Sequence, residues 1–206
     1  MNEAEFIEIS DFMNLLADRS KVITLEGFNS NLTLKVKDDG SPVTDYDINA
    51  EKILRETISA KFPNHNIFAE EMGLASNNSD YTWIIDPIDG TRSYVIGRPL
   101  WGTLISLAFK GEPIIGMADF PALDERWIGY KNKCLLNNVA FKKNYKSITN
   151  ISEATVGSTG PHLFSEIGKQ KYETLIKKSK YHVWSGDCHN YCLVIKGGKD
   201  LEVEEG

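Results

Sequence analysis

The sequence has few cysteines, no long apolar run and no excess of positive charge. Its three cysteines, Cys134, Cys188 and Cys192, cannot all pair, which argues against a disulfide framework and favours a reducing compartment. The longest apolar runs are too short to span a membrane, and the acidic N-terminus is not that of a signal peptide. A net charge of -6 argues against a nucleic-acid partner. We therefore expect a cytoplasmic protein with no membrane and no nucleic acid as partner.

The 206 residues are 41% hydrophobic and 25% charged, as in an ordinary globular protein with a core. Helices first, then antiparallel hairpins and then alternating elements predict an α+β fold of mixed layers. The polar stretch 142–153 is the best linker candidate, so we expect two parts, 1–141 and 142–206. Apolar spacing predicts helix 3–27, stopped by Gly27; hairpin 32–37 and 42–44 with a turn at 38–41; helix 46–61, with Ile48, Ile53, Leu54 and Ile58 inward; strands 67–69 and 82–85; helix 91–96; hairpin 102–109 and 113–119; strands 126–130 and 154–158; helix 165–178; strand 181–184; helix 186–196; and strand 200–203.

The most informative segment is 83–91, Trp-Ile-Ile-Asp-Pro-Ile-Asp-Gly-Thr. Its apolar strand ends in Asp86 and Asp89, and like charges this close are usually tolerated only with a cation between them. Because Glu70 ends the preceding strand, three carboxylates meet, a set that suits Mg²⁺ rather than Zn²⁺. Gly90 and Thr91 open the next helix, whose N-terminal amides suit an anion. Metal and anion in one turn predict hydrolysis of a phosphate ester by metal-activated water, which the Thr91 hydroxyl orients.

Two other interpretations of these acids remain open. Asp86 and Asp89 can simply cap the following helix, as Asp often does. Alternatively, the strand belongs to an aspartyl-phosphate phosphatase, in which the first Asp attacks phosphorus. Two residues separate the acids here instead of one, which takes the second acid away from the acid/base position.

The segment 83–91, preceded by Phe-Ala-Glu-Glu at 68–71 and Pro-Val-Thr-Asp-Tyr-Asp at 42–47, closely resembles the inositol monophosphatase superfamily. The resemblance covers essentially the whole chain and implies a layered αβαβα sandwich of the sugar-phosphatase type. It also implies two or more Mg²⁺ ions, with Mn²⁺ as a substitute, and a homodimer. Four runs resemble the histidinol-phosphate phosphatase branch, namely Asp-Gly-Thr-Arg-Ser-Tyr at 89–94, Gly-Arg-Pro-Leu-Trp-Gly at 97–102, Asp-Glu-Arg-Trp at 124–127 and Gly-Asp-Cys at 186–188.

Carried over by position, the resemblance assigns a role to each candidate site residue. It implies that Glu70, Asp86 and the Ile88 carbonyl hold one metal ion, and that Asp86 and Asp89 share a second. The catalytic set would comprise Glu70, Thr91 and Asp47, with Asp47 near the site through water.

For the substrate, the resemblance implies phosphate on the Gly90 and Thr91 amides, and Arg92, Asp187 and Glu204 in the binding pocket. Without the resemblance, Glu204 would be interpreted as a solvated charge and Arg92 as a surface residue.

The resemblance also implies a further metal-binding Asp, a last helix and strands beyond the position of Glu204. The sequence ends at Gly206, so we expect an incomplete second half and leave the activity of this chain open. The leading hypothesis is a Mg²⁺-dependent phosphatase of a small phosphorylated substrate, histidinol phosphate, in histidine biosynthesis. The alternatives are an inositol or other sugar phosphatase, and a non-catalytic phosphate-binding member.

Overall fold

The computed structural model describes residues 2–30, 32, 34–36, 42–143 and 148–205, and the chain divides into two compact units, Met1–Phe141 and Lys142–Gly206. Unit 1 contains α1 Glu3–Phe28, β1 Leu34–Val36, β2 Pro42–Thr44, α2 Asp45–Lys61, β3 Asn66–Ala69, β4 Gly73–Ala75, β5 Tyr81–Asp89, α3 Thr91–Val95, β6 Gly102–Phe109, β7 Glu112–Phe120, η1 Pro121–Leu123, β8 Glu125–Tyr130, β9 Lys133–Leu136 and β10 Val139–Ala140. Unit 2 contains η2 Ile151–Glu153, β11 Thr155–Ser158, η3 Pro161–Leu163, α4 Glu166–Ile176, β12 Tyr181–Trp184, α5 His189–Lys196 and β13 Leu201–Glu202.

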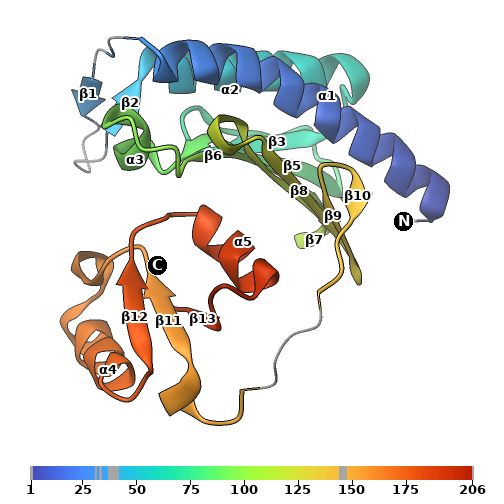
Figure 1. Ribbon diagram of the computed structural model, residues 1–206. Coiled ribbons are helices and arrows are strands. Elements are labelled where there is room, and N and C mark those ends of the chain that lie inside the picture. The colour runs from blue at the N-terminus through green and yellow to red at the C-terminus, as the bar shows by residue number, and fades with distance from the viewer. Residues whose placement is uncertain (1, 31, 33, 37–41, 144–147, 206) are drawn as a thin grey trace. The chain divides into compact units, whose positions relative to one another are not determined.

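Unit 1 is built on an eight-stranded sheet in the order β10-β9-β8-β7-β6-β5-β3-β4. Its neighbours are antiparallel except β3 and β5, which run parallel, so the expectation of mixed layers is confirmed. Helices α1 and α2 lie together over one face of this sheet (Figure 1). Their apolar stripes pack on inward side chains of β3, β5, β6 and β7, and Trp83 of β5 is fully buried there. This packing fixes the strand that carries the candidate site.

Several sequence-based predictions for unit 1 were wrong. Strand β5 does not end at residue 85: its pairing with β6 continues to Asp89, with an irregularity between Asp86 and Asp89. Gly27 does not stop α1, which ends at Phe28. Instead Gly27 is buried, and a Cβ there would overlap the side chains of two tyrosines. Ile48 is 40% exposed rather than inward.

Three short strands of the sheet, β4, β9 and β10, were not predicted from the sequence. They are two to four residues long, too short for an alternating apolar pattern to stand out. The hairpin of β1 and β2 forms as predicted, while its expected turn at 38–41 lies outside the described residues.

Unit 2 is built on a three-stranded parallel sheet in the order β12-β11-β13. Because the strands are parallel, their carboxyl ends lie at one edge, the edge at which α/β sheets usually bind ligands. Helix α5 begins at His189 rather than at the predicted 186, and Gly186 and Asp187 adopt positive φ angles before it. The three cysteines, all in the described part of the chain, form no disulfide bond.

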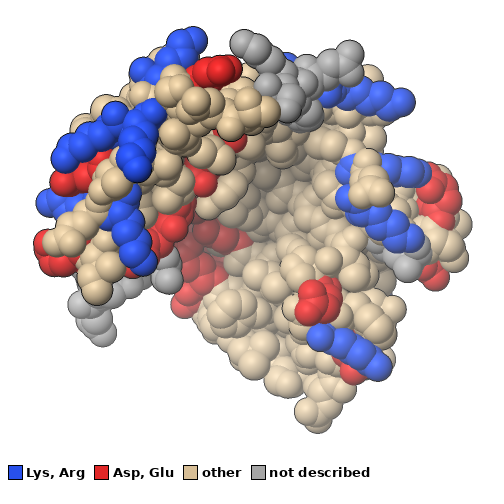
Figure 2. All heavy atoms as spheres, turned by 90° about the horizontal axis from the view of Figure 1, so that it is seen from below, with Lys and Arg blue, Asp and Glu red and all other residues tan. Residues whose placement is uncertain are grey.

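Figure 2 shows Lys and Arg side chains beside Asp and Glu side chains on the face it draws, a mixed surface rather than a single basic one. Among the described residues, no helix combines the length and the apolar character needed to cross a membrane.

Candidate active site

The turn at the end of β5 is held by its own polar groups. The Asp86 carboxylate oxygen Oδ1 accepts the backbone N–H of Ile88 at 3.1 Å. The Thr91 hydroxyl donates to the Ile88 carbonyl oxygen at 3.0 Å. Helix α3 has Gly90 as its N-cap, with φ 81° and no side-chain hydrogen bond to the cap. The N-cap residue of this helix is therefore neither Asp86 nor Asp89.

The same turn is also anchored from the core. The Thr103 hydroxyl on β6 donates to the Pro87 carbonyl oxygen at 2.8 Å. Thr103 in turn shares a hydrogen bond of 3.1 Å with the hydroxyl of Ser20 on α1, and both side chains are fully buried. Since a buried carbonyl without a partner is costly, these hydroxyls stabilise the irregular geometry between the two acids.

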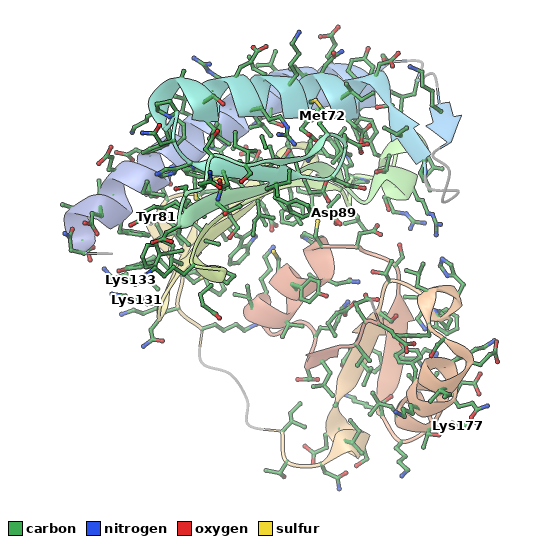
Figure 3. All side chains as sticks on the ribbon, turned by 180° about the vertical axis from the view of Figure 1, so that it is seen from behind. Met72, Tyr81, Asp89, Lys131, Lys133 and Lys177 are labelled. Atoms are coloured by element: carbon green, nitrogen blue, oxygen red, sulfur yellow. The ribbon has the colours of Figure 1, made fainter. Side chains whose placement is uncertain are left out.

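Two carboxylates, those of Glu70 and Asp89, act on Asp86. Burial, repulsion by Glu70 and Asp89 and a hydrogen bond with Glu70 together raise the pKa of Asp86 to about 9. Glu70 is exposed and directly follows β3, which runs parallel to β5, so the two strands deliver their acids to the same edge. In Figure 3 Tyr81 and Asp89 mark the two ends of β5, and the site lies at the Asp89 end. That these acids share one metal site stays a prediction.

Asp47 joins the same group from α2. Its carboxylate oxygen Oδ2 accepts the Thr44 backbone N–H at 2.9 Å and the Thr44 hydroxyl at 2.5 Å, which completes a capping box at the start of α2. Burial raises the pKa of Asp47, the two Thr44 hydrogen bonds oppose the shift, and repulsion by Glu70 adds to it. Asp47 therefore caps α2 and is also repelled by the Glu70 carboxylate of the candidate site.

The predicted metal ligands fit a hard cation in chemistry but do not enclose one. In the described part of the chain, no group of three or more His, Cys, Asp and Glu side chains is placed to hold a metal ion. The Asp86 carboxyl instead shares a hydrogen bond with Glu70. All donors are oxygens, and the repulsion by Glu70 and Asp89, which adds to burial in raising the pKa of Asp86, is what a divalent cation would neutralise. The metal role of Glu70, Asp86, the Ile88 carbonyl and Asp89 stays a prediction.

The remaining candidates are Arg92 in unit 1 and Asp187 and Glu204 in unit 2. Arg92 is an exposed residue of α3. Asp187 lies two residues before α5 with φ 43°, so its expected position on that helix is wrong. It follows β12, and Glu204 follows β13, so both lie beyond the carboxyl edge of the parallel sheet of unit 2. Glu204 accepts the Thr159 backbone N–H at 2.6 Å, and is therefore not a freely solvated charge.

A second carboxylate accompanies Glu204. Burial raises the pKa of Glu202 to about 7, its bond to Lys199 opposes the shift, and a hydrogen bond and repulsion from Glu204 add to it. Lys199 and Glu202 pair at 2.8 Å with almost no side-chain exposure. This edge of unit 2 is therefore acidic, and the positive charge of Lys199 offsets part of its negative charge.

The sequence analysis missed Glu51 and Arg55 of α2. Glu51 is fully buried and accepts the backbone N–H groups of Glu71 and Met72, directly after Glu70. A signal was present: Asp47, Glu51 and Arg55 recur every four residues, so charges interrupt the inward face of an amphipathic helix.

Comparisons with known proteins identify the family of the chain. The model of the inositol monophosphatase family matches residues 8–206. The bifunctional phosphatase IMPL2, chloroplastic, of Arabidopsis thaliana is 37% identical over 209 residues, which cover all of this chain and 60% of that protein. A histidinol-phosphatase of Chlorobaculum parvum is 33% identical over 92% of this chain and 74% of its own length. The chain thus spans only part of these relatives.

A solved structure of an inositol monophosphatase from Zymomonas mobilis superposes with a TM-score of 0.86 at 32% identity. The superposition covers all of this chain and 79% of that one. The layered α+β architecture expected from the sequence is confirmed by this match.

Proposed function

Because the chain belongs to the inositol monophosphatase family, we propose that it is a metal-dependent phosphomonoesterase acting on a small phosphate ester. The observation that carries this proposal is that Glu70 and Asp89 act on the buried Asp86 carboxyl, whose pKa burial and the repulsion of these two acids raise to about 9. A structural role would not require three acids at the neighbouring ends of β3 and β5, whereas a phosphatase that binds divalent cations would.

In this proposal the chain's own residues hold Mg²⁺ or Mn²⁺ through the side chains of Glu70, Asp86 and Asp89 and the Ile88 carbonyl. Bound metal would acidify a water molecule and neutralise phosphate charge. The Thr91 hydroxyl, already on the Ile88 carbonyl at 3.0 Å, is placed to accept and orient a water proton. Gly90 lacks a side chain, so phosphate can approach its backbone closely.

For the substrate, we propose histidinol phosphate. Two relatives support the choice, since one is named a histidinol-phosphatase and the other a bifunctional phosphatase. Asp187 and Glu204 place negative charge at the carboxyl edge of their sheet, which suits the amine of histidinol better than the hydroxyls of inositol. Inositol phosphate is the second candidate, because the superposed Zymomonas mobilis structure is named an inositol monophosphatase.

The test is phosphate release with Mg²⁺ from histidinol phosphate, inositol 1-phosphate and p-nitrophenyl phosphate. Asp187→Asn and Glu204→Gln should raise KM for histidinol phosphate more than for p-nitrophenyl phosphate, which has no amine. Glu205→Gln is the matched control, because that acid bonds the Ser165 backbone and hydroxyl instead. Equal effects on both esters, or faster turnover of inositol phosphate, would reject histidinol phosphate. No hydrolysis of any ester would favour the non-catalytic alternative.

The proposal includes a homodimer and a reducing, cytoplasmic-type compartment, which fits three described cysteines that form no disulfide bond. Sedimentation of the purified chain tests the dimer.

A further inference from the structure

The turn that carries Glu70 is tied to α2 by two charged side chains. The Glu51 carboxylate accepts the Glu71 backbone N–H at 2.7 Å and the Met72 backbone N–H at 3.0 Å. Arg55, one helical turn further, donates its Nε–H to the Glu51 carboxylate at 2.8 Å. Its guanidinium also donates to the carbonyl oxygen of Gly73. Figure 3 shows Met72 of this turn beside α2.

These bonds hold residues 70–72, a turn that has no pairing within the sheet. Strands β3 and β4 pair from Ala69 and Gly73 outward, which leaves Glu70, Glu71 and Met72 outside the ladder. Without Glu51, the backbone N–H groups of Glu71 and Met72 would have to donate their hydrogen bonds to water. Glu51 accepts both, and Arg55 closes the hairpin on its other side.

The arrangement is unlike a surface ion pair. The Glu51 side chain has no exposure and that of Arg55 is 15% exposed. Buried charges cost free energy unless every polar atom is bonded, and here the carboxylate receives three donors. By contrast, the Lys52–Glu56 pair on the same helix spans 4.0 Å with both side chains mostly exposed. Asp47, one turn before Glu51, already feels the charge of Glu70.

We propose that Glu51 and Arg55 are positioning residues for metal binding: they hold the three-residue turn so that Glu70 faces Asp86. The inference rests on the proposed function, because it assumes that Glu70 and Asp86 are metal ligands. Neither positioning residue touches the ion. Groups that orient metal ligands typically change metal affinity by about 10- to 100-fold when removed.

The experiment measures Mg²⁺ affinity of the whole chain by titration calorimetry, together with the melting temperature without metal. Glu51→Gln keeps the shape but turns one acceptor into an NH₂ group, which then faces a donor. It should weaken Mg²⁺ binding about 10- to 100-fold. Arg55→Lys keeps the charge but loses the paired donors, and should weaken binding by a smaller factor. Glu56→Gln is the matched control and should bind as the unmodified chain does.

A purely structural role would lower the melting temperature of Glu51→Gln and leave the Mg²⁺ affinity of the folded protein within twofold, which would overturn the inference. If Glu51→Gln does not fold, Arg55→Lys decides: unchanged affinity in that folded variant overturns the proposal, and weakened affinity supports it. Failure of the proposed function looks different. In that case the unmodified chain binds no Mg²⁺, or Glu70→Gln binds it as tightly as the unmodified chain.

Discussion

Binding of Mg²⁺ at Asp86 should displace a proton. Burial, Glu70 and Asp89 raise the pKa of the Asp86 carboxyl from 3.8 to about 9, so at neutral pH the metal-free site holds its proton. A divalent ion binds the carboxylate and not the acid, so metal and proton compete. Two changes therefore test this competition: a change in the pH of the titration, and the substitution Asp86→Asn.

The size of the effect follows from the raised pKa. At pH 7, about two units below it, roughly 1% of the Asp86 carboxyls are ionised, so each Mg²⁺ bound should release about one proton. The Kd should fall about tenfold for each unit of pH between 7 and 9 and level off above the pKa. The metal-free chain should lose stability as the pH rises from about 4 to about 9, because the pKa of Asp86 in the folded chain lies above its unfolded value of 3.8.

Calorimetry in buffers of different ionisation enthalpy counts the protons released, and repeating it from pH 6 to pH 10 gives the slope. Asp86→Asn should bind Mg²⁺ far more weakly and release no proton, since the ligand charge and the titrating group are both lost. A Kd that does not change between pH 7 and pH 9, with no proton release at pH 7, would refute the reasoning. So would an Asp86→Asn variant that keeps the affinity of the unmodified chain.

Three further results are expected. Gly27→Ala should destabilise the chain by about 1–3 kcal/mol in urea unfolding, because its Cβ would overlap two tyrosine side chains; an unchanged midpoint would contradict this. Burial lowers the pKa of His65, whose Nδ1 accepts the Trp83 indole N–H at 3.2 Å, so stability should fall below about pH 6.5, which Trp83 fluorescence during unfolding can follow. Thr91→Val should lose the bond to the Ile88 carbonyl and weaken Mg²⁺ binding, and Thr91→Ser should restore both; equal loss in both variants would exclude the hydroxyl as the cause.

The long amphipathic helices and the alternating strands could be predicted from the sequence because their burial follows a simple period. Helix α1, from Glu3 to Phe28, and the hairpin of β6 and β7 lie within a few residues of the predicted ranges. Short elements could not be predicted this way. Strand β4 has three residues, none of them buried, and is held instead by pairing with β3.

The site was predictable in part for a related reason. Asp86 and Asp89 stand out because acids after an apolar strand have no role in the core. The end of the strand could not be predicted. Strand β5 continues through both acids because it pairs with β6, and the sequence of one segment does not show which strand it pairs with. Glu51 was overlooked because a charge on a helix is usually interpreted as exposed, whereas this one is buried by bonds to a distant turn.

The hydroxyls of Ser20 and Thr103 share a hydrogen bond although 83 positions separate them in the sequence. The Thr103 hydroxyl also donates to the Pro87 carbonyl oxygen. Closing so long a loop costs chain entropy that is recovered only when the tertiary contacts form. During synthesis, α1 leaves the ribosome before β6, so the Ser20 hydroxyl cannot bond Thr103 until β6 has also emerged. The turn with Asp86 and Asp89 can thus reach its final geometry only after these two distant segments of unit 1 have met, which makes the candidate site a late product of folding.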